Sequence, residues 1–232
     1  MVYLLIILGL ASCKQQPDTS LSTDETETSE TVGQTQADNN SETDTPDEVE
    51  SIPEGWSELT EDEGFIVDIK YATEDNFTKK QIYDCGRCWL RPEAAQKVRK
   101  IKKELEEKYG YGIRLFDCFR PRPYQQRLWD AVPNPDYVTP PQKGSMHSRG
   151  LAVDLTITDA SGKDLDMGTV YDYFGKEAHQ DYAGLSQTVN KNRSLLKEIM
   201  KKHGFAPIRT EWWHYSDSTK SYPLDSWVWP CE

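Results

Sequence analysis

The stretch Ser145-Met-His-Ser-Arg-Gly-Leu-Ala-Val-Asp154 joins a polar loop to the start of an apolar segment. The apolar run that follows the loop predicts a buried strand over 151–158. Gly150 allows the backbone to turn sharply just before that strand. A histidine in the loop, His147, and an aspartate in the strand, Asp154, can therefore converge on one point.

A second stretch near the C-terminus, Glu211-Trp-Trp-His214, supplies another histidine from a different predicted strand. Two imidazoles and one carboxylate suit Zn²⁺, and a catalytic zinc site has three protein ligands and one open position. We therefore predict that His147, Asp154 and His214 bind one zinc ion. Each of these residues alone has an ordinary structural interpretation, so the prediction depends on their combination.

Two further residues could take part in hydrolysis. Glu211 is the candidate general base, because a carboxylate can accept a proton from the attacking water and return it to the leaving amine. Trp212 and Trp213 would give it a dry environment, which raises the pKa of a carboxyl group. Arg120 precedes Pro121 at a predicted strand end, and its guanidinium could stabilise an oxyanion.

The remaining pattern predicts a mixed α+β domain. Its sheet is expected to be mainly antiparallel, because strands and helices do not alternate regularly as in a parallel doubly wound fold. We expect a single catalytic domain over 52–232. Strands are predicted over 64–71, 113–119, 151–158 and 210–215, and helices over 92–109, 123–129 and 190–203.

The N-terminal region has a different character. Residues 1–13 are apolar, too short to span a bilayer as a helix, and end in Leu-Ala-Ser-Cys13, which resembles a bacterial lipobox. We expect a lipoprotein signal with Cys13 as the lipidated residue; the alternative is an ordinary signal peptide with an incidental cysteine. Residues 14–51 are predicted to form a disordered acidic tether, since 14–50 contain eleven Asp or Glu, one Lys and no aromatic residue.

Composition limits the partners and the compartment. Most of the formal charge of −12 comes from the acidic tether, and no basic stripe indicates nucleic-acid binding. Four cysteines remain in the domain, an even number that suggests disulfides in an exported protein, with the pairing open. Cys85 and Cys88 could alternatively form half of a zinc knuckle, although no second such pair completes it.

The motifs together resemble the zinc D-alanyl-D-alanine dipeptidases of the vancomycin-resistance type. The similarity covers most of 64–216 and includes Ser145-x-His147-x₆-Asp154 and Glu211-Trp-Trp-His214. It also includes the segments Lys70-Tyr-Ala-Thr73, Asn76-Phe-Thr78, Phe119-Arg-Pro121, Met167-Gly168 and Tyr171-Asp-Tyr173.

This resemblance implies roles for individual residues. It implies that His147, Asp154 and His214 bind zinc, that Glu211 is the base and that Arg120 steadies the transition state. It further implies that Tyr71, Ser145 and Asp172 shape the substrate pocket. The family uses a carboxylate at the position of Asp172 to recognise the free ammonium group of the dipeptide, and a buried cation does require a paired anion.

The expected function is hydrolysis of D-Ala-D-Ala to D-alanine during cell-wall turnover. The resistance enzymes are cytoplasmic, whereas this chain is expected to carry an export signal and has four domain cysteines. We therefore expect a membrane-anchored lipoprotein of the periplasm or cell envelope that acts on a small dipeptide. The alternatives are a D,D-carboxypeptidase or another peptidoglycan peptidase with the same zinc site, and a non-catalytic cell-wall binding module. Glu211 argues against the last, because a binding module needs no base.

Overall fold

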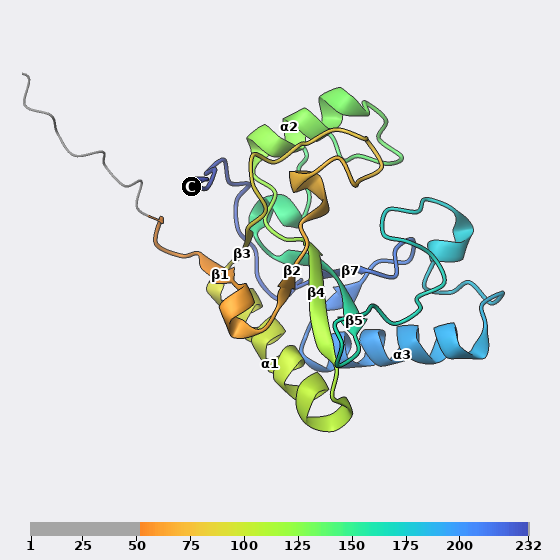
Figure 1. The fold of residues 1–232 in the computed structure, drawn as a ribbon. Helices are drawn as coiled ribbons and strands as arrows, with labels where there is room; N and C mark the ends of the chain where they lie inside the picture. Colours follow the sequence, from red (N-terminus) through yellow and green to blue (C-terminus); the bar gives the residue numbers. More distant parts are fainter. Residues whose placement is uncertain (1–51, 232) are drawn as a thin grey trace, which may run out of the picture. The chain divides into compact units, whose positions relative to one another are not determined.

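The computed structural model describes residues 52–231 (Figure 1). The predicted signal, Cys13 and all of the predicted tether lie outside these residues. The strands are β1 (Ser57–Leu59), β2 (Ile66–Val67), β3 (Cys88–Leu90), β4 (Gly112–Asp117), β5 (Ala152–Thr158), β6 (Ala206–Pro207) and β7 (His214–Ser216). The α-helices are α1 (Pro92–Tyr109), α2 (Arg122–Ala131) and α3 (Gln187–Lys202), and short 3₁₀ helices include η2 (Lys70–Ala72) and η3 (His147–Arg149).

The main sheet has five strands in the order β2-β4-β5-β7-β6. Only the β2–β4 pair is parallel; the other three pairs are antiparallel. A separate antiparallel pair is formed by β1 and β3. The predicted α+β class and the mainly antiparallel sheet are therefore confirmed.

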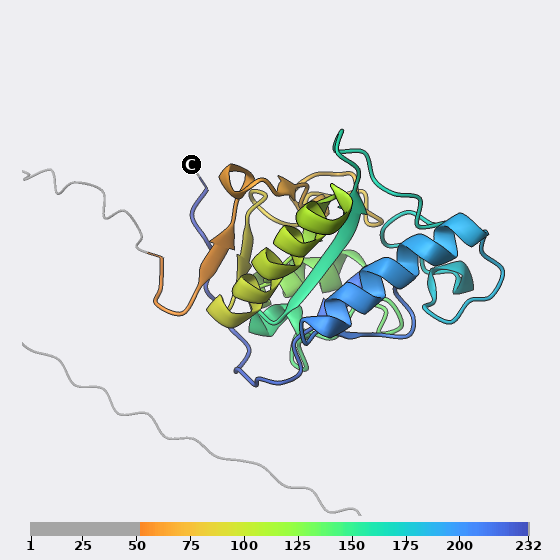
Figure 2. The ribbon, with the colours of Figure 1, turned by 90° about the horizontal axis from the view of Figure 1, so that it is seen from below.

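Helices cover the sheet because their apolar faces need partners. Helix α1 packs against β1, β3 and β4, and α3 packs against β6. Figure 1 shows α1 and α3 below the central strands and α2 above them, and Figure 2 shows α1 and α3 on either side of β5. Every residue of β5 is buried, which makes this strand the centre of the core.

The ends of the long helices follow from their sequences. Pro92 opens α1, where its missing N–H costs no helical hydrogen bond, and Gly110 ends it in the left-handed region at φ 67°. Helix α3 begins after Ser186, whose hydroxyl accepts a hydrogen bond from the amide of Val189 at 3.2 Å. The bounds predicted for α1 agree with the structure, and α3 begins three residues earlier than predicted.

Two predicted strands are much shorter in the structure. Of 64–71 only β2 forms, because the chain turns at η2, where the carbonyl of Tyr71 accepts hydrogen bonds from the amides of Ile82 and Tyr83, both at 2.8 Å. Of 210–215 only His214 and Tyr215 lie in β7, so Glu211 lies in the connection before the strand. The two turns place the side chains of Tyr71 and Glu211 in the lining of one pocket.

The four domain cysteines form two disulfides. Cys85 is bonded to Cys231, and Cys88 is bonded to Cys118. Cys85 and Cys88 therefore belong to different bridges and do not form half of a zinc knuckle. Among residues 52–231 the structure contains no helix with the length and apolar character needed to cross a membrane.

Candidate metal centre and active site

Three adjacent strands place acidic and imidazole side chains in one row. In the strand register, Asp117 at the end of β4 lies opposite Asp154 of β5, which lies opposite His214 of β7. His147 reaches the same row from η3, whose last turn closes at Gly150 with φ 71° and ψ 22°. A β-carbon at Gly150 would lie 2.5 Å from the Trp56 ring. Only glycine fits this turn without displacement, so Gly150 positions His147 relative to β5.

The donor atoms of His147, Asp154 and His214 lie close together, and all three residues are buried. Nε2 of His147 is 3.1 Å from Nδ1 of His214 and 3.3 Å from Oδ1 of Asp154. Nδ1 of His214 is 3.0 Å from the same Oδ1. Ligands at about 2.0–2.1 Å from a tetrahedral metal lie roughly 3.3 Å apart. The three atoms therefore have the spacing of one face of a metal coordination tetrahedron.

Neighbouring groups fix which atoms face the centre. The Nδ1–H of His147 can donate to the carbonyl of Cys118 at 2.7 Å, which leaves Nε2 as the lone-pair nitrogen. The hydroxyl of Tyr171 donates to Oδ2 of Asp154 at 3.1 Å, which leaves Oδ1. Such outer contacts orient metal ligands. The triad can thus hold a metal ion without rearrangement of these two side chains.

Arg120 is fixed by a buried network. Its Nε and Nη2 donate to Oδ2 of Asp117, the Nε bond measuring 3.1 Å, and Nε also lies 3.1 Å from the hydroxyl of Tyr83. That hydroxyl donates to Oδ1 of Asp117 at 2.7 Å. Nη1 of Arg120 donates to the Gln125 side chain at 3.3 Å. The guanidinium also lies over the Tyr71 ring, 5.0 Å from its centroid. It is therefore a pre-oriented cation at the wall of the site.

The triad opens into a small pocket of about 190 Å³. Pockets for drug-sized ligands span roughly 300–1,000 Å³, so this one suits a smaller molecule. Its lining includes every site residue expected from the sequence: Tyr71, Arg120, Ser145, His147, Asp154, Asp172, Glu211 and His214. A larger hollow of about 760 Å³ borders the pocket and shares only Asp172 with it. The larger hollow contains none of the triad, so we place the chemistry in the smaller pocket.

Glu211 has the environment expected of a proton-transfer group. Burial raises the pKa of its carboxyl group to about 7, although the nearby His214 lowers it. The Gln180 side chain donates to the backbone carbonyl of Glu211 at 3.1 Å and holds this connection. A carboxyl group that titrates near neutrality can both accept and return a proton.

Asp172 has an unusual backbone and an unusual side-chain environment. Its φ is 56°, one of two positive values among the non-glycine residues described. Its carboxylate accepts a hydrogen bond from the Tyr71 hydroxyl at 2.8 Å. Burial raises the pKa of Asp172 well above its usual range, and this bond opposes the rise. Backbone strain of this kind often marks a functional site. A positively charged group in the pocket would favour ionisation of this carboxyl group.

The donor chemistry supports a divalent cation. Asp154, Asp172 and Glu211 bring three carboxyl groups to the pocket, and Arg120 brings one cation. Carboxylates in close proximity disfavour one another's ionisation unless positive charge is added. A divalent ion at the triad would supply that charge, and the nitrogen and oxygen donors match borderline metals such as zinc.

The two other histidines, His179 and His203, lie outside this group. His203 directly follows the last residue of α3, and its Nε2 is 2.8 Å from Glu104. Nδ1 of His179 is 3.1 Å from the guanidinium of Arg209. Both contacts explain these residues without a metal.

Sequence reasoning missed the supporting residues Asp117, Tyr171 and the Cys118 carbonyl. A signal existed for Asp117, since a charged residue that ends an apolar strand needs a partner, and Arg120 is three residues away. Tyr171 is adjacent to Asp172, but nothing in its position indicates which carboxylate it contacts. The contact of a main-chain carbonyl leaves no trace in a sequence.

Comparison with known proteins agrees with this geometry. A family model described as D-ala-D-ala dipeptidase, of the M15 peptidases, matches residues 61–227. A D-alanyl-D-alanine dipeptidase of Escherichia coli K12 is 38% identical over 159 residues, covering 68% of this chain and 82% of the relative. One from Enterococcus faecium is 35% identical over 177 residues (67% and 87%). One from Streptomyces coelicolor is 31% identical over 181 residues (69% and 89%).

The matched region contains the triad, Glu211, Arg120 and Asp172, and it ends before Cys231. A family match over most of the chain and several relatives above 30% identity point to the same group. This chain is therefore a peptidase that belongs to the M15 family of D-Ala-D-Ala dipeptidases.

Proposed function

We propose that this protein is a zinc-dependent dipeptidase that hydrolyses D-Ala-D-Ala to two molecules of D-alanine. The main support is the convergence of Nε2 of His147, Oδ1 of Asp154 and Nδ1 of His214 at tetrahedral spacing inside a small pocket. The names of the related dipeptidases support the same substrate.

In this proposal His147, Asp154 and His214 hold the metal. Zinc, when bound, supplies Lewis acidity to a carbonyl oxygen and makes water more acidic. Glu211 accepts a proton from the attacking water and transfers it to the leaving amine. Its pKa of about 7 suits both steps near neutral pH.

Arg120 has an electrostatic role. As the peptide carbon becomes tetrahedral, negative charge develops on its oxygen, and a fixed donor stabilises that charge more than it stabilises the ground state. Asp117 and Tyr83 hold the guanidinium before substrate arrives. Little reorganisation is then needed during the reaction.

Asp172, Tyr71 and Ser145 define the substrate end of the pocket. Asp172 binds the free ammonium group of the dipeptide and becomes ionised as it does so, while Tyr71 keeps its carboxyl group oriented at 2.8 Å. Ser145 lies in the same lining, and its Oγ accepts a bond from the amide of Ser148 at 3.4 Å. This arrangement favours a substrate whose amine is not acylated.

The first experiment measures hydrolysis of D-Ala-D-Ala before and after chelation, and then after addition of Zn²⁺. We expect activity to disappear and return, with about one zinc per chain by elemental analysis. His147→Ala, Asp154→Ala and His214→Ala should each lose zinc and activity. Full zinc occupancy in all three variants would refute the ligand assignment.

A second experiment separates the base from the ligands. Glu211→Gln should keep its zinc but lose roughly 10²–10⁴-fold in kcat, the usual contribution of general acid–base catalysis. Loss of zinc in parallel with activity would make Glu211 a ligand instead. Arg120→Lys should also retain zinc and react slowly, since an ammonium group lacks the planar fork of a guanidinium.

The dipeptidase and carboxypeptidase alternatives differ in the substrate's amino group, which is free in a dipeptide and acylated in a longer peptide. N-acetyl-D-Ala-D-Ala lacks the charge that Asp172 binds and adds bulk to a small pocket. We expect its kcat/KM to be at least about 100-fold lower, equivalent to about 2.7 kcal/mol. Asp172→Ala should lose most of this preference. Equal values on the unmodified protein would favour the carboxypeptidase.

We also propose that the protein is exported and anchored through lipidated Cys13. The lipobox-like sequence supports this, and two disulfides suit an oxidising compartment. Cys13→Ser should move the protein from the membrane fraction to the soluble fraction. Unchanged membrane association would contradict the anchor.

A further inference from the structure

The backbone of Cys118 connects two parts of the site through its carbonyl and its amide. Its carbonyl lies 2.7 Å from Nδ1 of His147, and its amide donates to Oδ1 of Asp117 at 2.9 Å. Asp117 in turn holds Arg120. A displacement of this one residue would therefore disturb both the imidazole orientation and the buried ion pair.

Cys118 lies beyond the paired part of β4. The register with β5 shifts between Leu115 and Asp117, and Asp117 is the last paired residue of the strand. The sheet ladder therefore does not hold the peptide that orients His147. Another restraint must come from outside the five-stranded sheet.

That restraint comes from β3 in the two-stranded sheet. The Cys88–Cys118 disulfide joins β3 to the end of β4. The amide of Phe119 also donates to the carbonyl of Trp89 at 2.8 Å. The bridge is fully enclosed, with Cys88 0% and Cys118 1% exposed. Its sulfur atoms are thus fixed by packing as well as by the covalent bond.

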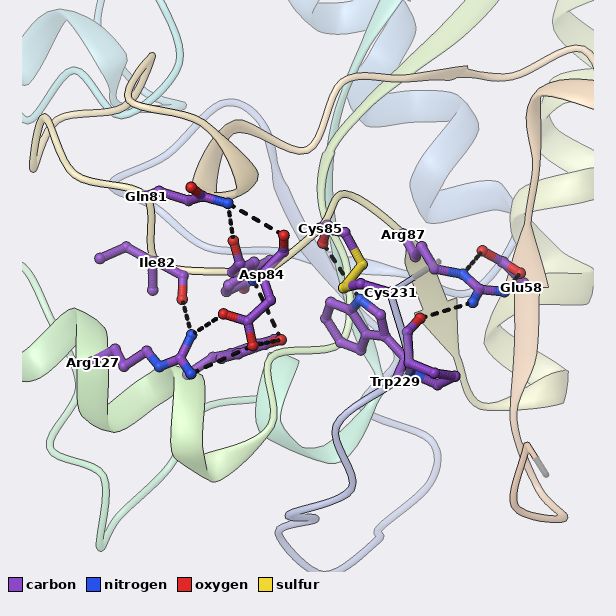
Figure 3. The surroundings of a disulfide bond; sticks show 12 residues. Glu58, Gln81, Ile82, Asp84, Cys85, Arg87, Arg127, Trp229 and Cys231 are labelled. Atoms are coloured by element: carbon purple, nitrogen blue, oxygen red, sulfur yellow. Dashed lines mark hydrogen bonds and ion pairs between the residues drawn. A yellow bond between two sulfur atoms is a disulfide. The ribbon is translucent and has the colours of Figure 1, made fainter. Parts of the chain in front are cut away.

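The second disulfide provides an internal contrast. Cys85–Cys231 is less enclosed, because Cys85 is half-buried and Cys231 is exposed. Figure 3 shows that it joins the segment around Trp229 to the loop that contains Cys85. Around it, Nε1 of Trp229 is 3.4 Å from the carbonyl of Cys85, and Arg87 donates to the carbonyl of Pro230 at 3.2 Å. These contacts join segments remote in sequence but do not include the peptide that touches His147.

We propose that the Cys88–Cys118 disulfide is a positioning element of the metal centre. It holds the Cys118 carbonyl against Nδ1–H of His147 and thereby directs Nε2 toward the metal. The inference rests on the proposed metal site. Outer contacts of a metal-bound histidine commonly contribute about 10–100-fold to metal affinity. Opening this bridge should weaken metal binding by that order.

The test compares two double variants of the full chain. Cys88→Ala/Cys118→Ala removes the positioning bridge, and Cys85→Ala/Cys231→Ala removes the surface bridge. The surface bridge links residues 146 apart, against 30 for the other, so its loss should lower Tm by at least as much on loop-closure grounds. The dissociation constant for Zn²⁺ is measured by competition with a chromogenic chelator, at a temperature where circular dichroism shows folded protein.

We expect zinc binding about 10–100-fold weaker without Cys88–Cys118, and within about threefold of the unmodified value without Cys85–Cys231. Equal affinity of the two variants, or an unchanged value in the first, would overturn the proposal. If the unmodified protein binds no zinc, both the proposed metal function and the proposed role of the disulfide are refuted. The two failures are thus distinguishable.

Graded reduction of the unmodified protein tests the proposal even if the first variant does not fold. A mild reductant should reach the surface bridge before the enclosed one, and alkylation with mass spectrometry identifies which cysteines are free. Zinc affinity should stay unchanged while only Cys85 and Cys231 are alkylated, and should fall when Cys88 and Cys118 become reactive. A fall at the first stage would contradict the proposed role.

Discussion

The substitution Asp117→Asn tests whether the Arg120 network is a buried ion pair that the fold needs. Asp117 is 0% exposed and accepts hydrogen bonds from Tyr83, from the amide of Cys118 and from two nitrogens of Arg120. Asparagine has nearly the same shape but no charge, and one of its two terminal atoms is a donor. That donor must face either a backbone N–H or the guanidinium.

The expected loss of stability comes from the Arg120 guanidinium, which is left without its counter-ion. The side chain of Arg120 is only 10% exposed, so its guanidinium stays largely shielded from water when its counter-ion is lost. Breaking a buried pair by removing one partner typically costs about 3–5 kcal/mol. Asp217→Asn is a matched control, because Asp217 is also 0% exposed but its partner Lys97 is 26% exposed. Lys97 can turn to solvent, so we expect a loss of about 1–3 kcal/mol there.

The assay is urea unfolding of the oxidised proteins in the presence of a chelator. The chelator removes the stabilisation that a bound metal would add to the native state. Asp117→Asn should lose about 2 kcal/mol more than Asp217→Asn, the difference between the two expected ranges. It should also lose most of its kcat, while Asp217→Asn should not. Equal losses of stability in the two variants, or a larger loss for Asp217→Asn, would refute the reasoning.

Three other substitutions address single contacts. Tyr171→Phe removes the 3.1 Å bond to Oδ2 of Asp154 and should weaken zinc binding about 10–100-fold in a chelator competition, whereas unchanged affinity would exclude a role. Hydrogen bonds from Lys108, Lys202 and His203 lower the pKa of Glu104 to about 2 from the ordinary 4.5. This contribution to stability is present above about pH 4.5 and is lost as pH falls toward 2. Glu104→Gln should therefore reduce the pH dependence of the unfolding free energy between these two values, measured by urea unfolding. Gly150→Ala forces a β-carbon into the left-handed region and should destabilise the fold by at least about 1–2 kcal/mol, measured by urea unfolding; a neutral result would show that the turn can relax.

Local patterns predicted the long elements well. The apolar spacing and the terminal proline and glycine specify α1, because each signal acts within a few residues of the place it describes. The strand over 151–158 was predicted for the same reason, and β5 begins one residue later. Short edge strands were less predictable, since the turn at Tyr71 depends on amides from residues 82 and 83. Partners outside the local window decide where such strands end.

In the site, too, some features follow from the local sequence and others depend on distant contacts. The residue types that could bind a metal were readable from His147, Asp154 and His214, and all three converge in the structure. The pairing of the four cysteines was not readable, because three pairings satisfy the same count and only the fold brings Cys118 near Cys88.

The choice of ligand atom shows most clearly where sequence reasoning stops. His147 presents Nε2 to the centre and His214 presents Nδ1, although the two residues are chemically identical. For His147 the choice is made by the Cys118 carbonyl, which occupies Nδ1. That carbonyl is set by the end of β4 and by the bridge to β3, features that depend on contacts between distant parts of the chain. A motif therefore specifies which residues can bind a metal, whereas the surrounding fold specifies the atoms and hence the affinity.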